Sequence, residues 1–209
     1  MLKKHLYLLQ HDATNTAGII NAWLNQHVDT LTATTLRLDQ GYNLTPLDPN
    51  SIDGLIILDS AASVDDHADW NAAERILIRT CDKRHVPVLG IGFGSCQIAR
   101  AFSAAVTPVT PINEWRFVTN VDNQQKYQVW QNNHEMWHLP AGAQSLFVDD
   151  CQKPQAFTLH EQLVGLQMHF EVTNDILQQM HVSQPIDSSV LPRNQQYLRQ
   201  LLTKLFIKN

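Results

Sequence analysis

The sequence predicts an α/β fold, a three-layer sandwich whose central sheet is mainly parallel and gains antiparallel strands in the second half. Strand-like and helix-like segments alternate through the first half of the chain. The short runs Gly54–Leu58 and Val86–Ile91 are almost continuously apolar, as strands covered on both faces require. Short strand-like runs separated by polar turns fill much of the second half. Together these features predict helices on both faces of one sheet.

The first half is expected to contain four strands and three helices. In the first helix, Ile19, Ile20, Trp23 and Leu24 recur at helical spacing, and the second helix repeats this pattern. Short connections between strands and helices favour parallel pairing. The expected strands are His5–Leu9, Thr32–Leu38, Gly54–Leu58 and Val86–Ile91, and the expected helices are Ala17–Leu24, Trp70–Cys81 and Ser95–Ala105.

The second half is expected to add a meander of short strands to the sheet, followed by two helices. The last of these strands carries His169. Because polar turns separate the strands, we expect antiparallel pairing between neighbours. The expected strands are Trp115–Val118, Tyr127–Trp130, Ser145–Val148, Gln155–Leu159 and Leu163–His169, and the helices lie near Asp175–Val182 and Asn194–Phe206.

Length, composition and charge exclude several functional classes for this protein. With 209 residues, 44% hydrophobic and 17% charged, residues 1–209 are expected to form a single domain. The formal net charge of −5 and the lack of a Lys/Arg block exclude the electrostatic pattern of nucleic-acid binding. Three cysteines fit a reducing compartment, and no apolar stretch is long enough to cross a bilayer. We expect a cytoplasmic protein that binds neither nucleic acid nor membrane.

A glycine-rich turn follows the strand Val86–Ile91. Gly90, Gly92 and Gly94 surround a tight turn between this strand and the next helix. In enzymes with such a turn, a Ser or Cys at its apex attacks the substrate, supported by amides at the helix N-terminus. The apex here is Gly92, which has no side chain. The alternative interpretation is that the glycines only permit the tight turn or the close approach of a ligand.

His169 and Glu171 are the second candidate pair. Residues two apart in a strand share one face, so Glu171 is placed to orient the His169 ring and raise its basicity. The alternative is a strand-end histidine that is merely hydrogen-bonded to a carboxylate.

His134–His138 matches the H-E-x-x-H pattern of zinc proteases, which requires both histidines on one helix face. Asn132 and Asn133 precede the motif, and Leu139-Pro140 follow it directly. A polar surface loop is therefore expected here, and neither a metal nor another cofactor is expected in the protein.

Several segments resemble class I glutamine amidotransferases, in the same order and spacing. Pro87–Ala101 resembles the family's nucleophile segment, G-I-C-F-G-x-Q-x-x-A, and Gly165–Thr173 resembles G-L-Q-F-H-x-E-V-T. Leu139–Ala143 and Pro154–Phe157 are similar to the family's L-P-x-G-A and N-Q-A-F stretches. The resemblance runs from the first strand to about Thr173 and is strongest to stand-alone members similar to the amidotransferase domain of GMP synthase. It implies a flavodoxin-like, glutamine amidotransferase-like domain.

The resemblance also implies roles for individual residues. In the family a Cys–His–Glu triad hydrolyses glutamine through a thioester, and His169 and Glu171 match its general base and orienting carboxylate. Gly92 stands at the nucleophile position, and Cys96 stands where the family has a glutamine that helps to hold the substrate. The remaining pocket and oxyanion-loop positions are Asp59, Ser60, Phe93 and Gly94.

These departures predict a glutamine amidotransferase-like protein that is degenerate for glutamine hydrolysis. A carboxylate at Asp59 opposes a developing oxyanion, and loss of a nucleophile removes several orders of magnitude in rate. We expect a binding module for a small molecule, with glutamine or a related amide as candidates, or for a protein partner or a second copy of the chain. The alternative is an active amidotransferase, glutaminase or amide hydrolase that uses a displaced Cys96 or the His169–Glu171 dyad.

Overall fold

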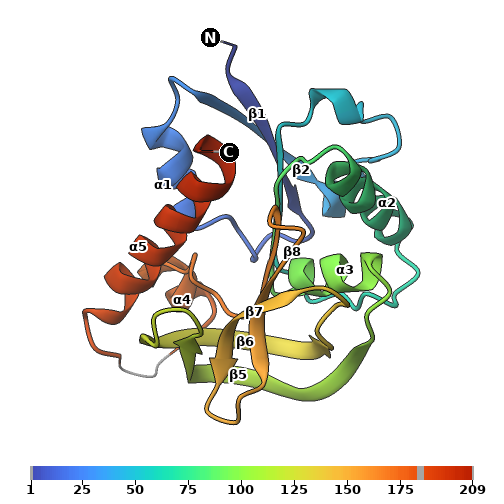
Figure 1. The fold of residues 1–209 in the computed structure, drawn as a ribbon. Coiled ribbons are helices and arrows are strands. Elements are labelled where there is room, and N and C mark those ends of the chain that lie inside the picture. Colours follow the sequence, from blue (N-terminus) through green and yellow to red (C-terminus); the bar gives the residue numbers. More distant parts are fainter. Residues whose placement is uncertain (1, 183–185, 209) are drawn as a thin grey trace.

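The computed structural model describes residues 2–182 and 186–208, and its centre is a nine-stranded sheet with the order β2-β1-β3-β4-β9-β8-β7-β5-β6 (Figure 1). The strands are β1 (Lys4–Gln10), β2 (Leu31–Arg37), β3 (Gly54–Ile57), β4 (Val88–Ile91), β5 (Val106–Asn120), β6 (Lys126–Trp137), β7 (Gln144–Asp149), β8 (Pro154–Leu159) and β9 (Leu163–Leu166). The helices are α1 (Ile19–Gln26), α2 (Asp69–Lys83), α3 (Phe93–Ala101), α4 (Asn174–Gln179) and α5 (Val190–Leu202).

The sheet changes character at β9. From β2 through β1, β3 and β4 to β9, every neighbouring pair is parallel. From β9 through β8, β7 and β5 to β6, every pair is antiparallel. Helix α1 connects β1 to β2, and α2 connects β3 to β4, so the parallel half is built from strand–helix–strand units. The predicted α/β fold class is confirmed.

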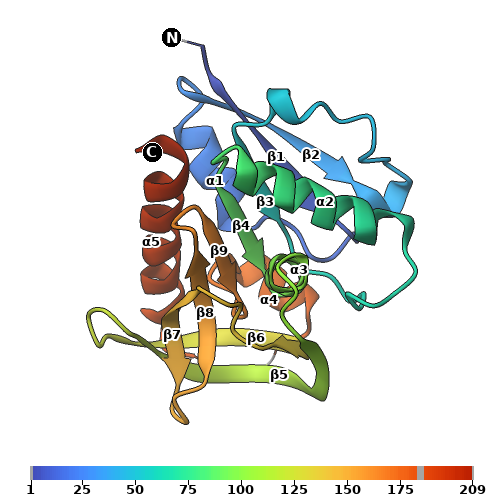
Figure 2. The same ribbon diagram turned by 45° about the vertical axis from the view of Figure 1, so that its right-hand side comes forward.

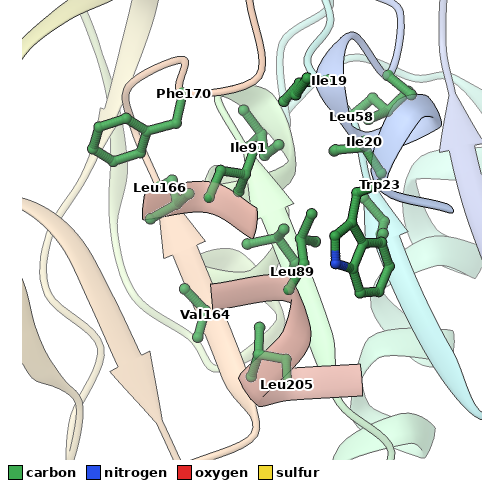
Figure 3. Close-up of a cluster of buried hydrophobic side chains, with 14 of the residues drawn as sticks. Ile19, Ile20, Trp23, Leu58, Leu89, Ile91, Val164, Leu166, Phe170 and Leu205 are labelled. Atoms are coloured by element: carbon green, nitrogen blue, oxygen red, sulfur yellow. The ribbon is translucent and has the colours of Figure 1, made fainter. Parts of the chain in front are cut away.

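Helices cover both faces of the parallel half (Figure 2), and a separate apolar cluster lies between the sheet and the helices on each face. On one face, Trp23 of α1 and Leu198 of α5 belong to the cluster that contains Leu89 and Leu166 of the sheet. Figure 3 shows the side chains of α1, β4, β9 and the C-terminal segment meeting in this cluster. On the other face, Leu77 of α2 and Ile98 of α3 pack with the strands.

Four expected elements have other boundaries than predicted. Helix α3 ends at Ala101 instead of Ala105, because Ser103 takes a positive φ of 62° and the chain turns into β5. Strands β5 and β6 are far longer than the short runs expected, at 15 and 12 residues. Strand β9 ends at Leu166 and does not carry His169. The backbone N–H of His169 instead donates to the Trp130 carbonyl of β6, 3.0 Å away, in an isolated bridge.

The surface loop expected at His134–His138 is also wrong. All but the last residue of this motif lie within β6, as does the preceding pair Asn132 and Asn133, and Asn133 and Glu135 are buried. The pairing of β6 with β5 places Asn133 opposite Ile112 and Glu135 opposite Pro108, with a shift of register between these two pairs.

Within the part of the chain that the structure describes, no helix is both long and apolar enough to traverse a bilayer.

Candidate functional site

Three segments meet where the parallel strands end. Asp59 follows β3, Gly92 links β4 to α3, and His169 follows β9. Ligand sites of open parallel sheets lie at the carboxyl ends of the strands, because the loops that leave these ends converge there. All three positions are among the site residues expected from the sequence.

The turn at Gly92 leaves no space for a side chain. Gly92 has φ +53° and ψ −116°, in the positive-φ region that favours glycine, and its N–H donates to the Leu166 carbonyl at 2.8 Å. A Cβ added to Gly92 would lie 2.5 Å from Cγ of Asp59 and closer still to Oδ1. A Cβ on Gly94 would lie 2.9 Å from the carbonyl carbon of Ile57, so α3 packs tightly against β3. The Asp59 carboxylate therefore occupies the space into which a side chain at position 92 would project.

The Asp59 carboxylate is buried between a backbone amide and an imidazole. Oδ1 accepts a hydrogen bond from the Phe93 N–H at 2.7 Å, and Oδ2 lies 3.7 Å from Nε2 of His169. The pKa of Asp59 lies above its ordinary value, because burial, helped by the charge of Glu171, outweighs the charge of His169 and the backbone N–H groups of Phe93 and Ser60. The Ser60 hydroxyl accepts from the Ala62 N–H at 3.1 Å.

His169 and Glu171 form a buried pair although they are not in a strand. Nδ1 of His169 lies 2.7 Å from Oε1 of Glu171, and His169 is 1% exposed. Burial lowers the pKa of His169, but the charge of Glu171, the hydrogen bond to Glu171 and the charge of Asp59 together raise it to about 9. The raised pKa favours the protonated imidazole at neutral pH, with Nδ1 bonded to Glu171 and Nε2 3.7 Å from Oδ2 of Asp59. Among the described residues, Nε2 has no hydrogen-bond acceptor within bonding distance.

Little space remains beside Asp59. The cavity there has a volume of about 10 Å³ and is lined by residues that include Asp59, Phe93, Cys96, Asn133, Glu135 and Gln167. A cavity of this size holds about one water molecule. A glutamine molecule does not fit in it.

Glu135 closes the side of this cavity nearest the loop that follows β3. Its carboxylate accepts hydrogen bonds from the Ser63 hydroxyl and, at 3.1 Å, from the Val64 N–H. Nε2 of His134 lies 3.2 Å from the carbonyl oxygen of Ala62. Two residues of the H-E-x-x-H pattern, His134 and Glu135, thus connect β6 to the loop that follows β3. In residues 2–182 and 186–208, no group of three His, Cys, Asp or Glu side chains is arranged to hold a metal ion.

Two solved structures with the same overall architecture are described as glutamine amidotransferases. The chain matches a glutamine amidotransferase from Thermotoga maritima with a TM-score of 0.79 and 21% identity, over 99% of this chain and 100% of that one. It matches a glutamine amidotransferase from Methylobacillus flagellatus with a TM-score of 0.83 and 18% identity, over 98% and 93% of the two chains. A candidate GMP synthase subunit from Thermoplasma acidophilum matches with a TM-score of 0.59 and 17% identity, over 97% and 99%.

The chain has the glutamine amidotransferase fold. No family model and no curated protein sequence matches it.

Within this glutamine amidotransferase fold, Cys96 lines the small cavity beside Asp59. It is 1% exposed, and its Sγ lies 3.9 Å from Oε1 of Gln167. Burial, together with the charges of Glu135 and Asp59, raises the pKa of the Cys96 thiol far above its ordinary value. At neutral pH the group is a protonated thiol.

A second buried His–Glu pair was not anticipated from the sequence. Nε2 of His11, directly after β1, lies 2.8 Å from Oε2 of Glu74 on α2, and both side chains are fully buried. The His11 ring also packs edge-on against Phe93, with ring centroids 5.0 Å apart. The pair therefore supports the residue whose N–H binds Asp59. A histidine at the end of the first buried strand was the available signal, but its partner is 63 residues away.

Proposed function

We propose that this protein is a glutamine amidotransferase-like binding module that has lost glutamine hydrolysis. The observation that carries the proposal is the position of the Asp59 carboxylate, which fills the space that a nucleophile side chain at Gly92 would need. The fold and the His169–Glu171 pair correspond to the amidotransferase pattern. The nucleophile is replaced by a carboxylate from the neighbouring strand.

The state of His169 supports the same proposal. A general base must accept a proton from a nucleophile or from water. With a pKa of about 9, the His169 imidazole already carries that proton at neutral pH. Its two N–H groups face Glu171 and Asp59, so His169 acts as a buried cation between two carboxylates.

The geometry disfavours Cys96 as a displaced nucleophile. The reactive form of cysteine is the thiolate, which electropositive and partly exposed surroundings favour. Cys96 is buried near Glu135 and Asp59, whose negative charges oppose thiolate formation. The neighbouring cavity of about 10 Å³ admits no amide substrate.

A binding role has space elsewhere in the molecule. A cavity of about 290 Å³ lies between the C-terminal part of α5 and the strands, lined in part by Asn120, Leu146, Tyr197 and Lys204. This volume is close to the lower end of the range for small-molecule sites. We propose a small molecule or a protein partner as the ligand of the module.

The test is covalent labelling of the wild-type protein with a glutamine-mimicking electrophile, with free glutamine as competitor, followed by peptide mapping. We expect no glutamine-competed adduct on Cys96 and no ammonia release from glutamine. A single competed adduct on Cys96 would overturn the proposal, as would ammonia release that the His169→Ala variant loses.

Two variants make the same test sensitive to the space at Gly92. Gly92→Cys alone should lower the melting temperature and release no ammonia, because the new Cβ collides with Asp59. Adding Asp59→Gly should recover part of the lost melting temperature, since the collision is then removed. A stable Gly92→Cys variant that hydrolyses glutamine without the second change would show that Asp59 does not fill the nucleophile's place.

A further inference from the structure

We propose that Asp59 is a built-in anion that fills an anion-binding site of this protein, and that the site takes a free small carboxylate once the Asp59 side chain is shortened. The inference rests on the proposed loss of cysteine chemistry at Gly92, and it specifies what replaced that chemistry. In this view the site is not merely inactive. Its own carboxylate keeps it occupied, so that external anions are excluded.

The first part of the site is the start of α3. This helix has nine residues, and the N–H of its first residue, Phe93, donates to Oδ1 of Asp59 at 2.7 Å. The first amides of a helix lack partners within the helix and carry partial positive charge, so they bind anions. In this structure the bound anion is a side chain of the same chain.

The second part of the site is an independent donor, the His169 ring. Its Nε2 is buried, lacks a hydrogen-bond partner among the described residues, and lies 3.7 Å from Oδ2 of Asp59. Because Glu171 holds the opposite ring nitrogen at 2.7 Å, the ring is fixed with Nε2 directed at the Asp59 carboxylate. The Asp59 carboxylate therefore lies between the two groups, with one oxygen bonded to the Phe93 N–H at 2.7 Å and the other 3.7 Å from the imidazole nitrogen.

Shortening Asp59 should leave both donors in place and empty the space between them. The Asp59→Ala variant removes one carboxylate group, which is the size of formate. The Asp59→Gly variant also removes the Cβ, so the vacated space is that of acetate. The Phe93 N–H would then be a buried donor without an acceptor, and Nε2 of His169 would lose the carboxylate that lies 3.7 Å away. An unpartnered buried donor is costly, and a bound anion relieves that cost.

The experiment is thermal denaturation of Asp59→Ala in sodium formate and of Asp59→Gly in acetate, each against sodium sulfate of equal ionic strength. Asp59→Asn is the matched control, because its amide keeps the space filled and an oxygen available to Phe93. We expect both shortened variants to melt below wild type. The size-matched anion should restore roughly 2–4 °C in a saturable way, an amount that corresponds to about 1 kcal/mol for a chain of this size. Wild type and Asp59→Asn should not respond.

Equal stabilisation of wild type, Asp59→Asn and the shortened variants would overturn the proposal, as would the absence of any anion effect on the shortened variants. If the shortened variants do not fold alone, refolding in formate or acetate, compared with sodium sulfate of equal ionic strength, decides the question. An anion site restores the fold with the size-matched anion and not with sulfate. The His169 pKa in Asp59→Asn, measured by NMR, is the second readout. A fall from the wild-type value supports the proposal, and an unchanged value contradicts it. Neither measurement depends on glutamine hydrolysis, so this inference and the proposed function can fail separately.

Discussion

At the scale of single residues, the chemistry of the site depends on the match between Gly92 and Asp59. Gly92 supplies the positive φ of the turn and leaves the space beside it empty, and Asp59 fills that space from the end of β3. Neither residue alone would place a carboxylate in this turn. A glycine at the apex would leave a vacancy, and an aspartate after β3 would collide with a side chain at the apex. Together they place a carboxylate, instead of a side chain at position 92, beside His169.

The same cluster predicts how stability depends on pH. The folded-state pKa of His169 is about 9, above its ordinary value of 6.5, because Glu171 and Asp59 outweigh the effect of burial. A histidine with a raised pKa stabilises the folded state fully below pH 6.5, and this contribution is lost as the pH rises through about 9. Its magnitude is about 3 kcal/mol by linkage. Urea denaturation of wild type and His169→Gln at a series of pH values measures it.

We expect the difference in unfolding free energy between the two proteins to shrink between pH 6.5 and 9.5. An NMR titration of wild type supplies the direct check, with the His169 ring signals unchanged between pH 6 and 7.5. A difference that stays constant over this range, or a ring that titrates near 6.5, would show that His169 is not held as a cation.

At the scale of elements, hydrogen bonds connect β6 to the loop after β3 beside the small cavity. Glu135 of β6 is the acceptor for the Ser63 hydroxyl and the Val64 N–H. Glu135→Ala would leave both donors without this acceptor, and we expect a loss of about 1–3 kcal/mol in unfolding free energy. The amide of Val64 should also exchange its hydrogen faster. Chemical denaturation and hydrogen exchange measure the two effects.

Glu114→Ala is the matched control for this prediction. Glu114 lies on the adjacent strand β5, is half exposed and pairs with Arg116 on the surface. Exposed ion pairs of this kind contribute little, so its removal should change the unfolding free energy by well under 1 kcal/mol. Similar losses in the two variants would show that Glu135 does not hold the loop.

The elements also show how far the sequence predicts this structure. The apolar strands β3 and β4 and the helices α1 and α2 are predicted closely, because their apolar residues follow a simple spacing. For β6 the sequence predicts too short a strand and a loop in place of its second half. Its burial does alternate along the strand, but the inward positions there include Gln131, Asn133 and Glu135. A hydrophobic pattern cannot detect a strand whose buried side chains are polar.

The site shows the corresponding limit. Local segments of the sequence point to Gly92, His169 and Glu171, and the structure places the His169 ring against Glu171. The contact of Asp59 with Phe93 joins residues 34 positions apart, and that of His11 with Glu74 joins residues 63 positions apart. Such contacts follow from the parallel arrangement of strand ends, which brings distant segments together, and no local spacing encodes them.

At the scale of the whole molecule, the continuous sheet makes the two halves of the chain depend on each other. The cluster on the α1–α5 face contains Leu6 of β1 and Phe147 of β7 as well as Phe206 near the C-terminus. The cluster on the other face joins Leu36 of β2 to Trp137 of β6. Because both clusters draw on both halves, we propose that the chain unfolds as one domain.

The tryptophans can test this cooperativity, because the five of them are spread over the chain. Trp23 and Trp70 lie on α1 and α2, whereas Trp115, Trp130 and Trp137 lie on β5 and β6. In protein labelled with 5-fluorotryptophan, each position gives its own fluorine NMR signal. We expect all five native signals to disappear at the same urea concentration, since neither half retains a complete apolar cluster without the other. If the signals of β5 and β6 were lost at a lower concentration than those of α1 and α2, the antiparallel half would be a separate folding unit. The cluster around Asp59 would then depend on the parallel half and on the docking of β6, where the Trp130 carbonyl holds the His169 backbone.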